Sequence, residues 1–180
     1  MLIAFSLPPL LLDPRSPHGH EARRAIRKCT RLVGKSQYQP GGVVFKIEGA
    51  FTRHTSKAAN AAALRALMDC LVSLDLLCLD AFPDLPPLYE SGTWYHLMPY
   101  QYPWDTVPSL YERGYGDCKS LAALRIAELK RAGIDATPVF RHLANDRGTM
   151  FHILVWRGDG QWECPSRILG MRTAEEEVRS

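Results

Sequence analysis

Cys118 lies where a glycine-rich turn meets a long amphipathic segment, within the stretch GYGDCKSLAALRIAELKRAGIDATPV at residues 114–139. Asp117 is a residue type that caps helices, so a helix is predicted over about residues 118–132, with Gly133 as its end. The positive end of a helix dipole lowers the pKa of a thiol in the first turn, and the unpaired N–H groups there can hold an oxyanion. This position predicts a nucleophile. The residues also leave open an inert, buried cysteine.

A nucleophilic thiol needs a base, and two histidines follow on predicted strands. His152 lies in TMFHILVW, and its rival His142 lies in ATPVFRHL. A third group normally orients the base through its other ring nitrogen. The next predicted strand, QWEC, offers Glu163 as its acidic residue, and Asp159 lies in the turn before it.

The elements that would position these residues follow from hydrophobic periodicity. After the cysteine helix the period changes from 3.6 to 2, which predicts an antiparallel meander of three strands. Before it, residues 93–113 are rich in aromatic residues and proline, which is typical of an ordered loop with one short helix; such a loop can line a substrate cleft or simply pack. The first half predicts a strand near the N-terminus, a helix ending at Gly34, the strand GGVVFKIEG, and a long helix capped by Thr55 or Ser56.

Charge and cysteine content exclude several classes of protein. The net charge of +3 is too small to indicate nucleic-acid binding by itself. The basic residues gather between Arg23 and Lys35, and we expect an exposed helix face there with at most weak affinity for nucleic acid. The five cysteines form no CxxC pair, which disfavours a zinc site and indicates free thiols. Of these five, we expect Cys118 alone to head a helix and to be the most reactive.

The apolar segments do not predict membrane attachment. The N-terminal stretch lacks a basic start and is interrupted by Pro8 and Pro9, so it is not expected to be a secretion signal. The apolar run at residues 58–79 carries Arg65, Asp69 and Asp75, which favours a buried helix over a membrane span. We expect no membrane partner.

The cysteine stretch and the later stretch HILVWRGDGQWECPSRILGM resemble the transglutaminase-like superfamily, in particular its small bacteriophage-encoded members. The resemblance covers about residues 88–171. It implies an α+β fold with a papain-like core, in which the helix bearing the cysteine is followed by an antiparallel sheet. By position it implies that Cys118 is the nucleophile and His152 the base. Residues 1–87 carry no recognised motif; we expect an N-terminal helical segment packed on the core of residues 88–180 in one compact domain.

Cys164 departs from the pattern of this family, which usually has aspartate immediately before the proline of the last motif. The resemblance implies that Cys164 lies within a few ångströms of the His152 imidazole. A neutral thiol is a weak acceptor, so the pKa of His152 should fall for want of a carboxylate. In the serine-protease template, replacing the orienting aspartate by its amide costs about 10⁴ in turnover. Glu163 points to the opposite strand face and could substitute only through a bulge.

Two functions remain open at this stage. An active enzyme would form a thioester at Cys118 with a protein or peptide substrate, and water or an amine would then release it; these outcomes correspond to an amidase or peptidase and to a crosslinker. Neither a metal nor another cofactor is expected for these steps. The alternative is a catalytically inactive virion structural or assembly component, whose partners would be other phage structural proteins. The host cytoplasm or the virion is the expected location.

Overall fold

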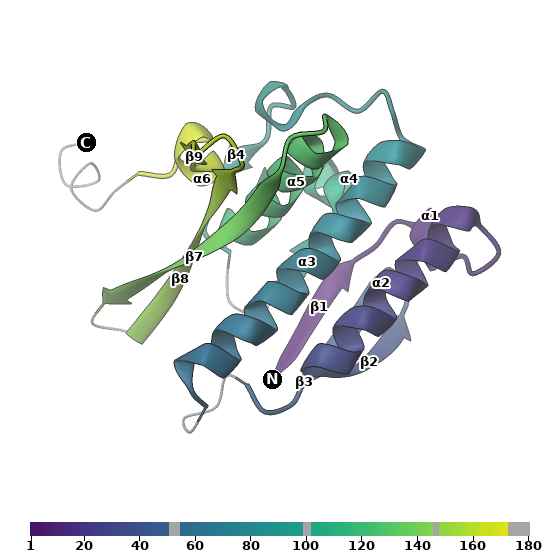
Figure 1. The fold of residues 1–180 in the computed structure, drawn as a ribbon. Coiled ribbons are helices and arrows are strands. Elements are labelled where there is room, and N and C mark those ends of the chain that lie inside the picture. The colour runs from purple at the N-terminus through teal and green to yellow at the C-terminus, as the bar shows by residue number, and fades with distance from the viewer. Residues whose placement is uncertain (51–54, 99–101, 146–147, 173–180) are drawn as a thin grey trace.

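The computed structural model describes residues 1–50, 55–98, 102–145 and 148–172, with the side chains of residues 142–151 outside the description. The first half supplies strands β1 (Leu2–Ser6), β2 (Gly34–Gln39) and β3 (Gly42–Ile47) and helices α1 (Pro9–Leu12), α2 (Pro17–Val33) and α3 (Lys57–Ala81). The long helix α3 runs through the middle of the molecule, with α2 on one side and the β7–β8 hairpin on the other (Figure 1).

The second half is organised around α5 (Cys118–Arg131). Before it come the 3-10 turn η1 (Leu88–Glu90), β4 (Trp94–Tyr95), β5 (Trp104–Asp105), α4 (Val107–Arg113) and β6 (Tyr115–Gly116). After it come β7 (Ala136–Asn145), β8 (Gly148–Arg157), β9 (Trp162–Glu163) and α6 (Pro165–Ile168). The sheet order β7-β8-β9 is antiparallel throughout, and α5 packs against β7 and β8.

The predicted helix, its cap and the meander are confirmed, as is the α+β class. The Asp117 carboxylate caps α5 by accepting from the Lys119 N–H at 3.3 Å, and Gly133 follows the last turn in a left-handed conformation. Ser56 caps α3 by accepting from the Ala59 N–H at 3.2 Å. Side-chain capping and apolar periodicity are local signals, so the sequence alone carries them.

The first half contains a β-sheet in addition to the helices that were expected there. A four-stranded sheet has the order β2-β3-β1-β5, and β2 was not among the predicted strands. None of the residues of β2 is buried, so this edge strand lacks the apolar alternation by which a strand is identified. The helix α1 was also missed, because its sequence PLLL is too short to show a helical period.

The two halves share one hydrophobic core. Strand β5 pairs in parallel with β1, so a short piece of the second half completes the N-terminal sheet. The Asp105 N–H then donates to the Ser120 hydroxyl on α5 at 3.2 Å. Leu67 and Leu71 of α3 and Leu121 of α5 are fully buried in the same cluster. The N-terminal sheet therefore helps to fix the first turn of α5, where Cys118 lies.

The basic face of α2 is exposed, as predicted. The exposed basic residues are Arg24, Arg27, Lys28 and Arg31 on α2 and Lys35 on β2. Arg23 is half-buried and covers the Tyr38 ring at 4.4 Å. Weak affinity for nucleic acid stays a prediction. Within the described residues, no helix has the length and apolarity that crossing a bilayer requires.

Candidate active site at the start of α5

Cys118 is the first residue of α5, and its thiol lies against strand β8. The side chain is half-buried and hydrogen-bonds to the backbone of Ile153, the residue that follows His152. The sheet behind the helix thus brings Cys118 against β8, the strand that carries His152. This arrangement needs the meander to fold back onto α5, which Figure 1 shows as the packing of β7 and β8 against the helix.

The expected lowering of the Cys118 pKa is wrong for this environment. Burial raises the pKa of the thiol to about 12, and the Asp117 carboxylate that caps the same helix also raises it. Lys119 and the backbone contacts with Ile153 and Cys118 itself act in the opposite direction but do not outweigh burial. The resting group is therefore a thiol, and a base must remove its proton before or during attack.

His152 and Cys164 are in direct contact. The imidazole Nε2 lies 3.2 Å from the Cys164 sulfur, which agrees with the placement expected from the resemblance. Nε2 faces the Cys164 sulfur, so Nδ1 is the ring nitrogen that this contact does not use. Cys164 also precedes the four-residue helix α6, so Cys118 is not alone among the cysteines in heading a helix. The rival base His142 lies on β7 opposite Phe151, and its side chain lies outside the described residues.

The His152 imidazole lies in a positively charged setting. Burial lowers its pKa below the ordinary 6.5, and the guanidinium groups of Arg141 and Arg167 lower it further. The direction agrees with the expectation, but the causes are burial and the charges of two arginines. A neutral imidazole at physiological pH is in the right state to accept a proton.

Neither of the two acidic residues considered as substitutes takes the place of the aspartate among the described contacts. The Glu163 Oε1 atom accepts from Arg125 Nε at 2.6 Å and from the Tyr89 hydroxyl. Asp159 pairs with Arg157 at 2.9 Å. Glu163 thus faces α5, on the side of β9 away from Cys164, as strand alternation requires.

Tyr95 is a site residue that sequence reasoning missed. Burial raises the pKa of its hydroxyl to about 12, and Cys118, Asp117 and Cys164 all raise it further, so the hydroxyl shares their surroundings. The residue lies on β4, which pairs in parallel with β6 through Tyr95 and Gly116. A strand of two residues has no detectable period. The aromatic density of residues 93–113 was the available signal.

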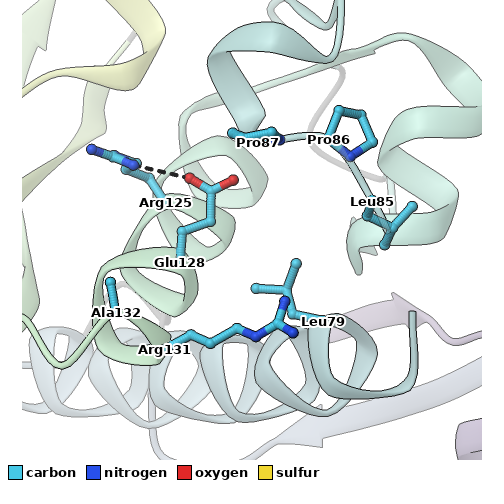
Figure 2. A pocket seen from close by; sticks show the side chains of 8 residues that line it. All are labelled: Leu79, Leu85, Pro86, Pro87, Arg125, Glu128, Arg131 and Ala132. Atoms are coloured by element: carbon cyan, nitrogen blue, oxygen red, sulfur yellow. Dashed lines mark hydrogen bonds and ion pairs between the residues drawn. The ribbon is translucent and has the colours of Figure 1, made fainter. Parts of the chain in front are cut away.

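A groove lies at the other end of α5 (Figure 2). It has a volume of about 360 Å³ and is lined by Leu79, Leu85, Pro86, Pro87, Arg125, Glu128, Arg131 and Ala132. Its charges are paired: Arg125 binds Glu128 at 3.1 Å, and Arg131 faces Asp80 at 3.6 Å. Figure 2 shows the first pair across the groove wall. This groove lies between α3, α5 and the loop that contains Pro86 and Pro87. Its lining contains none of the predicted site residues.

The described residues therefore place a thiol, an imidazole, a second thiol and a phenol around the start of α5. They contain no group of three or more metal-ligating side chains arranged to hold an ion. Comparisons of the chain with protein-family models, curated proteins and solved structures found no match.

Proposed function

We propose that this protein is a transglutaminase-like cysteine acyl-transfer protein with a papain-like core, acting on amide bonds of proteins or peptides. The observation that carries the proposal is the contact between His152 Nε2 and Cys164 Sγ at 3.2 Å, with the Cys118 thiol against the next residue of β8. In this proposal Cys118 is the nucleophile, His152 is the base and Cys164 is the residue that orients the base.

The reaction begins with proton transfer from the Cys118 thiol to Nδ1 of neutral His152. The sulfur attacks the substrate carbonyl, and backbone N–H groups at the start of α5 stabilise the oxyanion. Collapse of the tetrahedral intermediate expels the amine, which takes its proton from the imidazolium, and leaves a thioester on Cys118. Water then gives the acid, or a second amine gives a crosslink.

The pKa values of the Cys118 thiol and the His152 imidazole favour a slow enzyme. The thiol pKa is raised to about 12 and the imidazole pKa is lowered, so the thiolate–imidazolium pair is sparsely populated. Cys164 adds no negative charge to stabilise the imidazolium. Turnover therefore depends on proton transfer concerted with attack.

The same observations favour a second candidate, an inactive virion structural or assembly component on this fold. Within the described contacts His152 has a thiol instead of a carboxylate beside Nε2, and burial suppresses the thiolate at Cys118. In that case Cys118, His152 and Cys164 would only contribute to packing, and the partners would be other structural proteins of the particle.

Trapping of the thioester separates these two functions. The purified protein is incubated with a panel of glutamine peptides and backbone peptide amides, with hydroxylamine as the acceptor, and hydroxamate product and acylated Cys118 are measured by mass spectrometry. We expect product with the parent chain and with Cys70→Ser, a control thiol buried on α3, and none with Cys118→Ala. Absence of acylated Cys118 in both the parent and Cys164→Asp would favour the structural candidate.

A further inference from the structure

We propose that Cys29 and Cys70 form a dithiol site that reacts with small peroxides and closes into a disulfide between α2 and α3. This site uses neither Cys118 nor His152. The inference therefore goes beyond the proposed function and does not depend on it.

The two thiols meet where α2 packs against α3. Cys29 is 2% exposed and Cys70 is 3% exposed. Both line the same cavity between the two helices, and a side-chain hydrogen bond links them. Cys78, also on α3, is just as buried but interacts with Asp75 and Thr106 instead. The packing of α2 on α3 thus brings together one particular pair of thiols.

The shared cavity admits a small oxidant and excludes a large one. Its volume is about 70 Å³, and its lining includes the exposed residues Lys28 and Leu32, so it reaches the surface. One water molecule occupies about 30 Å³ in the liquid. Hydrogen peroxide, which has only one more oxygen atom than water, fits this space. Oxidised glutathione, a disulfide of two tripeptides, does not.

The contact between the thiols gives them different roles. The pKa of the Cys70 thiol is raised well above its ordinary value, first by the hydrogen bond with Cys29 and then by burial. A hydrogen bond that favours the neutral form keeps a thiol protonated, whereas the thiolate is the form that attacks. Cys29 is therefore the thiol that attacks first, and Cys70 is the resolving thiol.

The reaction takes two steps. The Cys29 sulfur attacks one oxygen of the peroxide, the O–O bond breaks, and a sulfenic acid and a water molecule are formed. The Cys70 sulfur then attacks the Cys29 sulfur, so that the S–S bond forms as the S–O bond breaks. The thiol proton of Cys70 leaves with the hydroxyl group as a second water. Two thiols are oxidised, and one hydrogen peroxide is reduced to two waters.

The disulfide would tie α2 to α3, which also packs against α5. A crosslink between residues 29 and 70 closes a long loop and so restricts the unfolded chain. We expect oxidation to raise the midpoint of thermal unfolding by about 5 °C.

Peptide mapping of the oxidised protein tests the site directly. The folded parent is treated with hydrogen peroxide, the remaining thiols are blocked, and the chain is digested with trypsin and an endoproteinase that cleaves before aspartate. This digestion places Cys29 in residues 29–31, Cys70 in residues 69–74 and Cys78 in residues 75–79. We expect a crosslink between the first two peptides, which forms about ten-fold faster with hydrogen peroxide than with oxidised glutathione.

Variants separate this pair from the other thiols. Cys78→Ser removes a buried thiol from α3 and should leave the crosslink unchanged. Cys70→Ser should leave a sulfenic acid on Cys29, which dimedone traps, whereas Cys29→Ser should give no dimedone adduct at Cys70. Circular dichroism confirms that each variant is folded, and peroxide-treated Cys70→Ser is the control for the unfolding midpoint.

Each outcome decides part of the inference. If peroxide produces no crosslink between Cys29 and Cys70 in the folded parent, the dithiol site is wrong, whereas the acyl transfer proposed for Cys118 is untouched. A crosslink that forms only in urea would show that the folded packing keeps the thiols apart and would also overturn the site. Equal rates with the two oxidants would refute the selection of small peroxides, and an unchanged unfolding midpoint would refute the tie between the helices.

Discussion

The two ends of α5 differ in how their polar groups are partnered. At the C-terminal end, Arg125, Glu128 and Arg131 form ion pairs around the groove of Figure 2, and Glu128 also accepts from the Leu88 N–H at 2.6 Å. At the N-terminal end, the contact that matters is the Cys164 thiol against the His152 imidazole, whose pKa is also lowered by the charges of Arg141 and Arg167.

This difference shows why concavity alone does not locate the chemistry. The groove lies between α3, the loop of Pro86 and Pro87, and α5, and its charged side chains neutralise one another. The start of α5 instead holds groups whose pKa values the surroundings have shifted. Shifted protonation together with close geometry is the better indicator of a reactive site.

The largest effect should come from the base. His152→Ala removes the acceptor for the Cys118 proton and should lower the rate of thioester formation about 10²- to 10⁴-fold. Pre-steady-state mass spectrometry of acylated Cys118 measures this rate. The matched control at the other end of the helix is Arg131→Gln, which should leave the rate unchanged. An equal loss of rate in both variants would show that the two ends of α5 do not differ in their contribution to the reaction.

The second prediction concerns stability. Arg125→Met leaves Glu163 and Glu128 without their shared cation at a mostly buried position and should lower the free energy of unfolding by about 3 kcal/mol. Arg131→Met removes a more exposed pair with Asp80 and should cost less than about 1 kcal/mol. Urea denaturation of both variants gives the comparison. Equal costs would show that the C-terminal charges are not held as the contacts indicate.

Introducing a carboxylate at position 164 should increase the reactivity of Cys118 at the N-terminal end of α5. Cys164→Asp places a negative charge at Nε2 of His152, raises the pKa of the imidazole and should speed iodoacetamide labelling of Cys118 about ten-fold at pH 6.5. Cys164→Ser provides a neutral control of similar size and should label like the parent. If the serine variant gains as much as the aspartate variant, the missing charge is not what limits the site.

The smallest effect is in the titration of His152 itself. Its folded pKa lies below the unfolded value of 6.5, so the unfolded chain binds more protons between those two values. Stability from the neutral imidazole is therefore complete above pH 6.5 and is lost as the pH falls through the folded pKa. NMR titration should show that the pKa rises in Arg141→Gln and stays unchanged in Arg24→Gln.

Much of the fold around the site follows from local patterns. The Asp117 cap, the period of α5, the glycine after it and the alternation of β7 and β8 all depend on residues a few positions apart. The edge strand β2 lacks such a pattern because none of its residues is buried, although its partner β3 follows it directly in the chain. The strand β4 has only two residues, and its partner β6 comes later in the chain and stabilises it. Tyr95 was missed together with β4.

The sequence by itself determined that a thiol begins a helix at Cys118, that His152 lies on a later strand, and that Cys164 stands immediately before Pro165. Only the tertiary structure decided how these groups ionise. Burial against β8 reversed the pKa shift expected for Cys118, and Arg141 came next to His152 through the β7–β8 register. Helix capping depends on neighbours along the chain, whereas a pKa depends on the burial and charges that distant segments bring together.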